Sequence, residues 1–304
     1  MTLAKSPVPN RPHREPEPSV HPDHDRGLEF DVRTLVARRS ALGLLGGAGL
    51  AALAGCTDGS PGAAAGPSAA TTGSTTSPVS PSGSATGTAS GTPAVDTQVP
   101  AETAGPFPGD GSNGQDVLDD TGIVRKDLRS SIGTSTTTAT GVPLTVNLTV
   151  LDAANGYGAM PGVAVYAWHC DAQGRYSMYS PGVEDENYLR GVQPTDASGT
   201  ATFTTVFPGC YQGRWPHIHF EVYRSTAEAT SDGQIVRTSQ LALPQTACEA
   251  VYGDTATYPS SADSLSRTSL TQDMVFGDDG GIHQLATVTG DASSGYVANL
   301  TVGV

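Results

Sequence analysis

The sequence contains few charged and few aromatic residues, which make up 15% and 6% of its 304 residues. A globular domain usually carries about a quarter charged residues, so this scarcity argues against one compact 304-residue domain and against a long coiled coil. Basic residues are the scarcest group: 16 Lys and Arg stand against 30 Asp and Glu, and the formal net charge is -14. Because nucleic-acid binding needs a basic surface, we expect no nucleic-acid partner.

Long hydrophobic runs are also absent. Residues 40–55 are uncharged and rich in Ala, Gly and Leu, but a membrane-spanning helix needs about 20 such residues. Arg38 and Arg39 precede this stretch, and a Leu-Ala-Gly-Cys motif ends it at Cys56. A basic pair, a short apolar segment and small residues are typical of a secretory signal. We therefore interpret residues 1–56 as a signal peptide that resembles the twin-arginine type, with a lipobox-like motif at Cys56.

Glycine and proline, in contrast, are abundant, with 37 and 22 residues. Residues 57–98 consist almost entirely of Gly, Ser, Thr, Ala and Pro, and such a segment cannot bury enough apolar surface to fold. We interpret it as a disordered, flexible linker, and a glycosylated stalk stays open as an alternative. We expect an exported bacterial lipoprotein at the outer face of the cell membrane, or a secreted protein, whose only membrane contact is a lipid on Cys56.

The remaining residues, 99–304, have the pattern of an all-β domain. Residues 143–151 alternate apolar and polar side chains with period two, which predicts a strand. Further strand-like runs cover residues 163–168, 199–206, 218–223, 235–243, 283–288 and 295–302. Only residues 246–253 and 262–273 suggest helices. Many short strands separated by turns predict an antiparallel β-sandwich with short helices in its loops.

The number of cysteines allows a prediction about disulfide pairing. If Cys56 is lipidated, Cys170, Cys210 and Cys248 remain, which is an odd number for an oxidising compartment. One disulfide and one buried thiol are the economical arrangement. We expect Cys210 to pair with Cys248 and Cys170 to be buried at a strand end, although other pairings stay open.

Two histidines are candidate ligands for a metal ion. His217 and His219 flank one residue in a strand-like run, so their imidazoles lie on the same face and can share a metal ion such as Zn, Cu or Fe. Tyr211 precedes them, and Tyr176 follows a glycine turn. A tyrosine with a pKa of about 10 becomes a ligand only beside a strong cation. Two tyrosines and two histidines favour Fe(III), whereas a copper or hydrolytic site made by the histidines alone stays open.

Several motifs in order resemble a known family. The segments 168–177, 187–196 and 203–209, and the histidine region after them, resemble the intradiol ring-cleavage dioxygenases, which include catechol 1,2-dioxygenase and protocatechuate 3,4-dioxygenase. The segment 102–107 resembles that family's entry segment, with Phe107 where a tyrosine is common. The resemblance covers roughly residues 100–250. It implies an all-β catalytic domain over residues 99–304.

The resemblance also implies a reaction and a set of site residues. A non-haem Fe(III) would cleave a small aromatic diol between its two hydroxyl-bearing carbons with O₂, giving a cis,cis-muconate-type product. The implied metal ligands are Tyr176, Tyr211, His217 and His219. Tyr211 would also act as a proton acceptor, Arg214 would stabilise negative charge, and Gln240 would support orientation. The helical dimerisation region of catechol dioxygenases has no counterpart, so the oligomeric state stays open.

Three other polar residues are expected to lie outside the set of catalytic and metal-binding residues. We expect Arg190 to be a structural residue, His169 to pack or form hydrogen bonds at a strand end, and His283 to lie outside the site. The main alternative function is a non-enzymatic, tethered β-sandwich that binds saccharide or protein. Such a module would be colourless and indifferent to iron.

Overall fold

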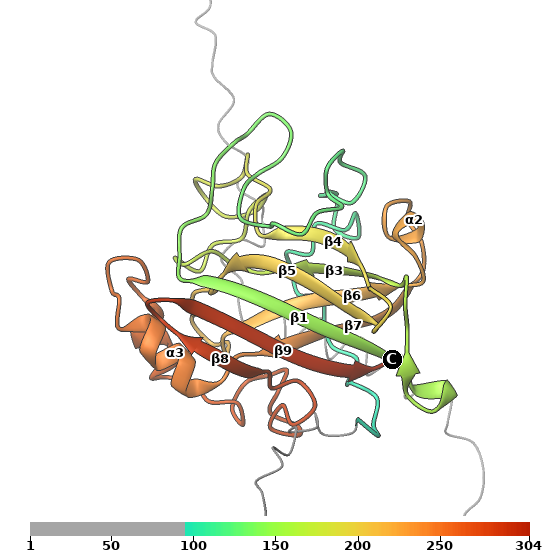
Figure 1. Cartoon of the computed structure of the whole chain (residues 1–304). Helices are drawn as coiled ribbons and strands as arrows, with labels where there is room; N and C mark the ends of the chain where they lie inside the picture. The colour runs from blue at the N-terminus through green and yellow to red at the C-terminus, as the bar shows by residue number, and fades with distance from the viewer. Residues whose placement is uncertain (1–94) are drawn as a thin grey trace, which may run out of the picture. The chain divides into compact units, whose positions relative to one another are not determined.

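The structure is a computed structural model that describes residues 95–304 (Figure 1). The predicted signal peptide, the lipid anchor at Cys56 and most of the linker lie outside the described residues, so these stay predictions. Within residues 95–304, no helix combines the length and apolar character needed to cross a membrane.

The first of two sheets is built around β1 (Pro143–Asp152). One edge of β1 pairs antiparallel with β5 (Thr200–Val206) and with the short β2 (Gly158–Ala159). The other edge pairs in parallel with β9 (Gly295–Gly303), which pairs antiparallel with β8 (Thr287–Asp291). The period-two pattern places alternate residues of β1 in the core: Leu144, Val146, Leu148 and Val150.

The second sheet has the order β4 (Arg190–Pro194), β3 (Ala164–Trp168), β6 (His217–Tyr223) and β7 (Ile235–Ala242), with every neighbouring pair antiparallel. All residues of β3 and β6 are buried, because both faces of this sheet are covered. On the inner face, Val165 and Phe220 pack with Val146 and Phe203 of the first sheet. The outer face carries a separate cluster that includes Trp168.

This arrangement confirms the predicted all-β sandwich. Figure 1 shows the sheet of β1 and β9 lying in front of the sheet of β3 and β6, with α3 beside β8. The described helices are short and lie in the connections: η2 (Ala153–Asn155), α2 (Thr226–Ala229), α3 (Gln245–Tyr252) and α4 (Ser261–Leu265). One strand pair, β1 with β9, is parallel instead of antiparallel.

Some element boundaries differ from the predictions. The helix expected over residues 262–273 ends at Leu265, and the strand expected over 283–288 lies at Thr287–Asp291. The strand β4 was not predicted, because its sequence contains Gly and Pro and has no apolar alternation. Its five residues nevertheless complete the edge of the second sheet.

The predicted disulfide between Cys210 and Cys248 is wrong. Cys170, Cys210 and Cys248 are all free and buried. The thiol of Cys170 donates to the carbonyl of Gly209 at 3.4 Å, and each of the other two thiols also faces a backbone carbonyl. Burial raises the pKa of Cys210 to about 12. The three thiols therefore act as small core residues, as unpaired buried cysteines usually do.

His169 joins the two sheets, in agreement with its predicted structural role. It follows β3, and its imidazole contacts the carbonyl of Cys170 at 2.8 Å and the hydroxyl of Thr205, on β5, at 2.7 Å. Burial lowers the pKa of His169 to about 4. The folded protein therefore keeps this ring neutral at pH values where the unfolded chain protonates it.

We predict that this buried ring makes the fold sensitive to acid. Because the folded pKa lies below the unfolded value of about 6.5, the contribution of His169 is present above that value and declines as the pH falls toward 4. Between pH 7 and pH 5 the decline amounts to about 2 kcal/mol. Urea unfolding of His169→Gln should show a correspondingly smaller drop in unfolding free energy over that range. An equal drop in variant and wild type would contradict the prediction.

Candidate metal centre

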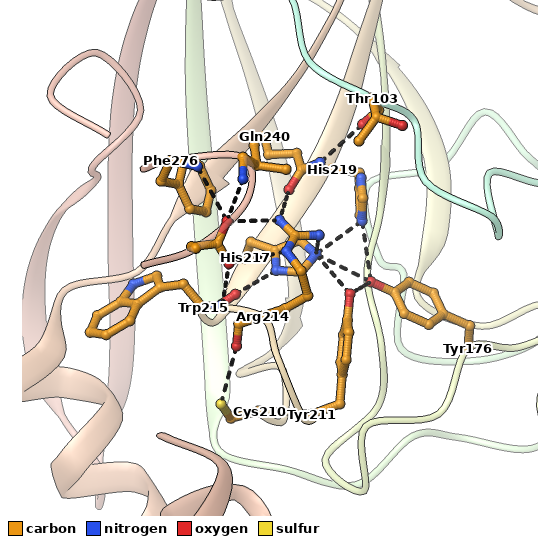
Figure 2. Close-up of polar contacts among 12 residues, drawn as sticks. Thr103, Tyr176, Cys210, Tyr211, Arg214, Trp215, His217, His219, Gln240 and Phe276 are labelled. Atoms are coloured by element: carbon orange, nitrogen blue, oxygen red, sulfur yellow. Dashed lines mark hydrogen bonds and ion pairs between the residues drawn. The ribbon is translucent and has the colours of Figure 1, made fainter. Parts of the chain in front are cut away.

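The four predicted ligands converge on one point. The two Nε2 atoms of His217 and His219 lie 3.0 Å apart, and the phenol oxygens of Tyr176 and Tyr211 lie 3.3 Å apart. The Tyr176 oxygen is 3.2 Å from His219 Nε2 and 3.5 Å from His217 Nε2, and the Tyr211 oxygen is 3.2 Å from His217 Nε2. Figure 2 shows both phenol groups directed toward the imidazoles.

The sheet and one glycine bring these side chains together. His217 and His219 both project from the outer face of β6, since residues two apart in a strand share a face. Tyr176 and Tyr211 lie on two loops that approach each other at Gly174, which has φ 83°. A Cβ at Gly174 would lie 3.2 Å from the Cβ of Tyr211, so glycine permits both the turn and the close approach.

The imidazoles are neutral and available as ligands. Burial, together with the charge of Arg214, lowers the pKa of His217 to about 3, and burial with the neighbouring His217 lowers the pKa of His219 well below its usual value. The Nδ1–H of His217 donates to the carbonyl of Trp215 at 2.5 Å, which leaves the lone pair on Nε2. The buried Nδ1 of His219 has no hydrogen-bond partner, so this ring engages polar groups only through Nε2.

These donors fit one metal ion. Ligand atoms about 2.0–2.1 Å from a single ion lie about 3.0–3.4 Å from one another, which is close to the separations of these four atoms. Burial raises the pKa of Tyr176, so its phenolate form needs a cation to stabilise it. Among the described residues no group of three or more His, Cys, Asp or Glu side chains is placed to hold a metal. The two phenol oxygens bring the number of potential donors at this point to four.

Arg214 and Gln240 lie beside the four donors. The Nη2 of Arg214 donates to Oε1 of Gln240 at 2.6 Å, and its Nη1 lies 3.5 Å from His217 Nε2. Gln240 in turn donates to the carbonyl of Thr103 at 2.9 Å. The segment 102–107 is thus connected to the site through the backbone of Thr103, and Figure 2 shows this chain of contacts.

Asp273 is a site residue that the sequence did not reveal. Its carboxylate forms an ion pair with Arg214 Nε at 3.0 Å, and the two side chains are 0% and 1% exposed. It also accepts from the backbone N–H groups of Trp215 at 2.6 Å and Val275 at 2.8 Å. Burial alone would raise the pKa of Asp273, but Arg214 and these N–H donors hold it below its usual value. Asp273 therefore stays ionised and fixes the guanidinium.

Aromatic side chains enclose the donors. Trp168 stacks on His219 with ring centroids 4.9 Å apart and an interplanar angle of 8°. The ring of Phe107 packs against Tyr176 at 5.3 Å. A small cavity at the centre has eight lining residues: Ala104, Pro106, Phe107, Trp168, Tyr176, Tyr211, Arg214 and His219.

Arg190 forms hydrogen bonds to two segments that line this cavity, which agrees with its predicted structural role. Its buried guanidinium donates to the carbonyls of Phe107 at 3.0 Å and Pro108 at 2.7 Å. It also donates to the carbonyl of Ser177 at 2.9 Å, next to Tyr176. Arg190 therefore connects the segment around Phe107 to the loop of a donor tyrosine. His169 and His283 are not among the four donors.

We predict that the ion pair of Arg214 and Asp273 is essential for stability. Asp273→Ala leaves a buried guanidinium without its counter-charge and should lower the unfolding free energy by about 3–5 kcal/mol. The exposed pair of Asp263 and Arg267, with both side chains 66% exposed, gives a matched control. Asp263→Ala should cost less than about 1 kcal/mol. Urea unfolding measures both variants, and equal losses would contradict the prediction.

The chain is similar to several solved structures at low sequence identity. No curated protein matches the chain. Among solved structures, the intradiol ring-cleavage dioxygenase from Tetranychus urticae is 23% identical, covering 60% of this chain and 86% of that one, with a TM-score of 0.49. The dioxygenase domain of a dioxygenase and carbohydrate-binding fusion from Streptomyces sp. SirexAA-E is 24% identical, covering 68% and 98%, with a TM-score of 0.43. The hydroxyquinol 1,2-dioxygenase from Pseudomonas putida DLL-E4 is 16% identical, covering 69% and 68%, with a TM-score of 0.41.

A family comparison gives a local match. Residues 127–230 match the family described as "Dioxygenase". This segment contains all four donors and Arg214, whereas Gln240 and Asp273 lie beyond its end. The match shows that residues 127–230 are similar to this family, which supports the prediction of an oxygenase enzyme.

Proposed function

We propose that residues 99–304 form an intradiol ring-cleavage dioxygenase. The reaction opens a catechol-type ring between its two hydroxyl-bearing carbons with O₂ and gives a cis,cis-muconate-type dicarboxylate. The observation that carries this proposal is the convergence of two phenol oxygens and two neutral imidazoles, in which five of the six separations are 3.0–3.5 Å, in a segment that matches a dioxygenase family.

We propose that Tyr176, Tyr211, His217 and His219 hold a non-haem Fe(III). Two anionic phenolates and two neutral imidazoles are a hard donor set suited to a trivalent cation. When bound, the ferric ion supplies Lewis acidity that polarises the diol for its reaction with O₂. Trp168 stacks on His219 and Phe107 packs on Tyr176, so aromatic rings cover one side of each of these two donors.

The two tyrosines have different roles. Tyr176 is buried, and its phenol lies within 3.5 Å of both imidazoles, so we assign it a permanent ligand role. Tyr211 is only partly buried and lies in a loop before β6. Its phenol oxygen faces the cavity, where it can accept a hydroxyl proton from an incoming diol.

Arg214 provides a fixed positive charge at the same cavity. Its guanidinium is held by Asp273 on one side and by Gln240 on the other, so it does not need to reorganise when negative charge develops on the substrate oxygens. Gln240 acts through Arg214 and is itself anchored to Thr103. Both residues therefore prepare the site before substrate arrives.

The sequence supports an extracytoplasmic setting for this activity. We propose that residues 1–56 direct export, that Cys56 carries the lipid, and that residues 57–98 tether the enzyme to the outer face of the membrane. Its partners would then be small aromatic diols and O₂ outside the cell. Detection of a diacylglyceryl group on Cys56 by mass spectrometry of the mature protein tests this setting.

We predict that the iron-loaded protein is coloured and that its colour depends on Tyr176. A tyrosinate bound to Fe(III) absorbs visible light by charge transfer. Tyr176→Phe should therefore lose much of this absorption band. It should also lower the affinity for iron by a larger factor than the loss of a residue that only orients a ligand, which costs about 10- to 100-fold. The measurements are visible absorption, iron content and oxygen uptake with catechol.

Tyr179→Phe is the matched control. Tyr179 lies on the same loop, but its hydroxyl contacts Asn113 and the N–H of Gly109 instead of the imidazoles. It should keep the band and the iron. A colourless protein that holds stoichiometric zinc or copper would contradict the proposed function.

A further inference from the structure

We propose that Asp171 is a positioning residue that holds the two tyrosine donors at a fixed separation. The inference rests on the proposed function and adds to it a residue outside the four donors. Asp171 follows β3 and begins the turn that leads to Tyr176, and its side chain is 3% exposed. Its carboxylate holds the loop of Tyr176, and its backbone carbonyl holds the loop of Tyr211.

The carboxylate of Asp171 fixes the turn that ends at Tyr176. Its Oδ1 accepts from the backbone N–H groups of Gln173 and Arg175, both at 2.9 Å. The backbone N–H of Asp171 donates in turn to the carbonyl of Arg175 at 2.8 Å. An aspartate that accepts from the backbone two residues further on commonly closes such a turn. Because Arg175 directly precedes Tyr176, these three bonds fix the backbone immediately before the donor phenol.

The second carboxylate oxygen braces the same loop from its other end. Oδ2 of Asp171 pairs with Nη2 of Arg175 at 2.8 Å and accepts from the hydroxyl of Tyr188 at 3.1 Å. The carbonyl of Tyr188 accepts from the hydroxyl of Ser177 at 2.7 Å, and Ser177 directly follows Tyr176. A buried carboxylate is tolerated when its oxygens are paired and hydrogen-bonded, as they are here. These bonds therefore hold the backbone on both sides of Tyr176.

The backbone carbonyl of Asp171 binds the loop of the second donor. It accepts from the N–H of Gly174 at 2.9 Å and from the N–H of Gly209 at 3.0 Å. Gly209 lies shortly before Tyr211 in the same loop. The two loops are in close contact here, because a Cβ at Gly209 would lie 2.9 Å from the carbonyl oxygen of Asp171 and 2.7 Å from that of Ala172. The loop of Tyr211 therefore takes its position from the turn that Asp171 holds.

The separation of the two phenol oxygens, 3.3 Å, thus depends on Asp171. A residue that only orients a metal ligand commonly contributes about 10- to 100-fold to metal affinity. The energy of the absorption band of a tyrosinate bound to Fe(III) depends on where the phenolate lies relative to the ion. A displaced loop therefore changes the band as well as the affinity, and this readout separates positioning from a general loss of stability.

Asp171→Ala tests the inference in the full-length protein. It should lower the affinity for iron by about 10- to 100-fold and shift the visible absorption maximum of the iron-loaded protein. Arg175→Ala is the matched control, because it removes the ion pair but leaves both backbone bonds of Oδ1, and it should leave the maximum unchanged. Leu148→Ala in β1 controls for stability: it should lower the unfolding free energy without changing the maximum.

Gly209→Ala tests the same contact from the other loop. Its methyl group would meet the carbonyl oxygens of Asp171 and Ala172, so it should displace the loop of Tyr211, weaken iron binding and shift the absorption maximum. The two variants change different loops, so a folding defect in one leaves the other as a test.

Amide hydrogen exchange gives a readout that does not need iron. In metal-free Asp171→Ala, the amide of Gly209 should exchange at least about 10-fold faster than in the wild type, although the carbonyl that accepts from it is still present. The reason is that the turn that holds this carbonyl has lost the carboxylate that closes it.

Two results overturn the inference. One is an Asp171→Ala or Gly209→Ala protein that binds iron as tightly as the wild type and has the same absorption maximum. The other is an equal shift in Arg175→Ala or Leu148→Ala, because the ion pair or general stability would then be responsible. Failure of the proposed function looks different: the wild type would bind no iron and cleave no catechol, and the exchange of Gly209 would still decide whether Asp171 holds both loops.

Discussion

The register of four antiparallel strands determines the geometry of this site. Across the second sheet, Arg190 of β4 pairs with Trp168 of β3, Trp168 pairs with His219 of β6, and His219 pairs with Gln240 of β7. These four residues form one row on the outer face, away from the core between the two sheets. A slip of one residue in any pair would turn these side chains toward the other face. The sheet therefore fixes the positions of His219 and Gln240, whereas loops supply Tyr176 and Tyr211.

Two buried arginines connect this row to the loops around it. Arg190 donates to backbone carbonyls of the segment 107–108 and of the Tyr176 loop, so its hydrogen bonds connect these two loops. Arg214 is paired with Asp273 and oriented by Gln240. Burying such groups is costly unless their hydrogen bonds are satisfied, and here the bonds join segments that are distant in the sequence. The same contacts that stabilise the fold thus preorganise the candidate site.

Much of the candidate site could be predicted from the sequence, because its signals are local. The spacing of His217 and His219 reports their common face directly, and the resemblance places Tyr176 and Tyr211 with them. Asp273 was missed because it acts across 59 residues of sequence, in a loop that looks like the end of a helix. The strand β4, the parallel pairing of β1 with β9 and the free thiol of Cys210 were missed for the same reason. Each depends on tertiary contacts that no local pattern encodes.

We propose that two tyrosines and two histidines hold one iron ion. Crystals of the iron-loaded protein, measured with X-rays on both sides of the iron absorption edge, test it most directly. The account predicts a single anomalous peak about 2 Å from the phenol oxygen of Tyr176 and from Nε2 of both His217 and His219, with Tyr211 completing the set. A peak that lies elsewhere, or a zinc or copper ion held by the two histidines alone, would contradict it.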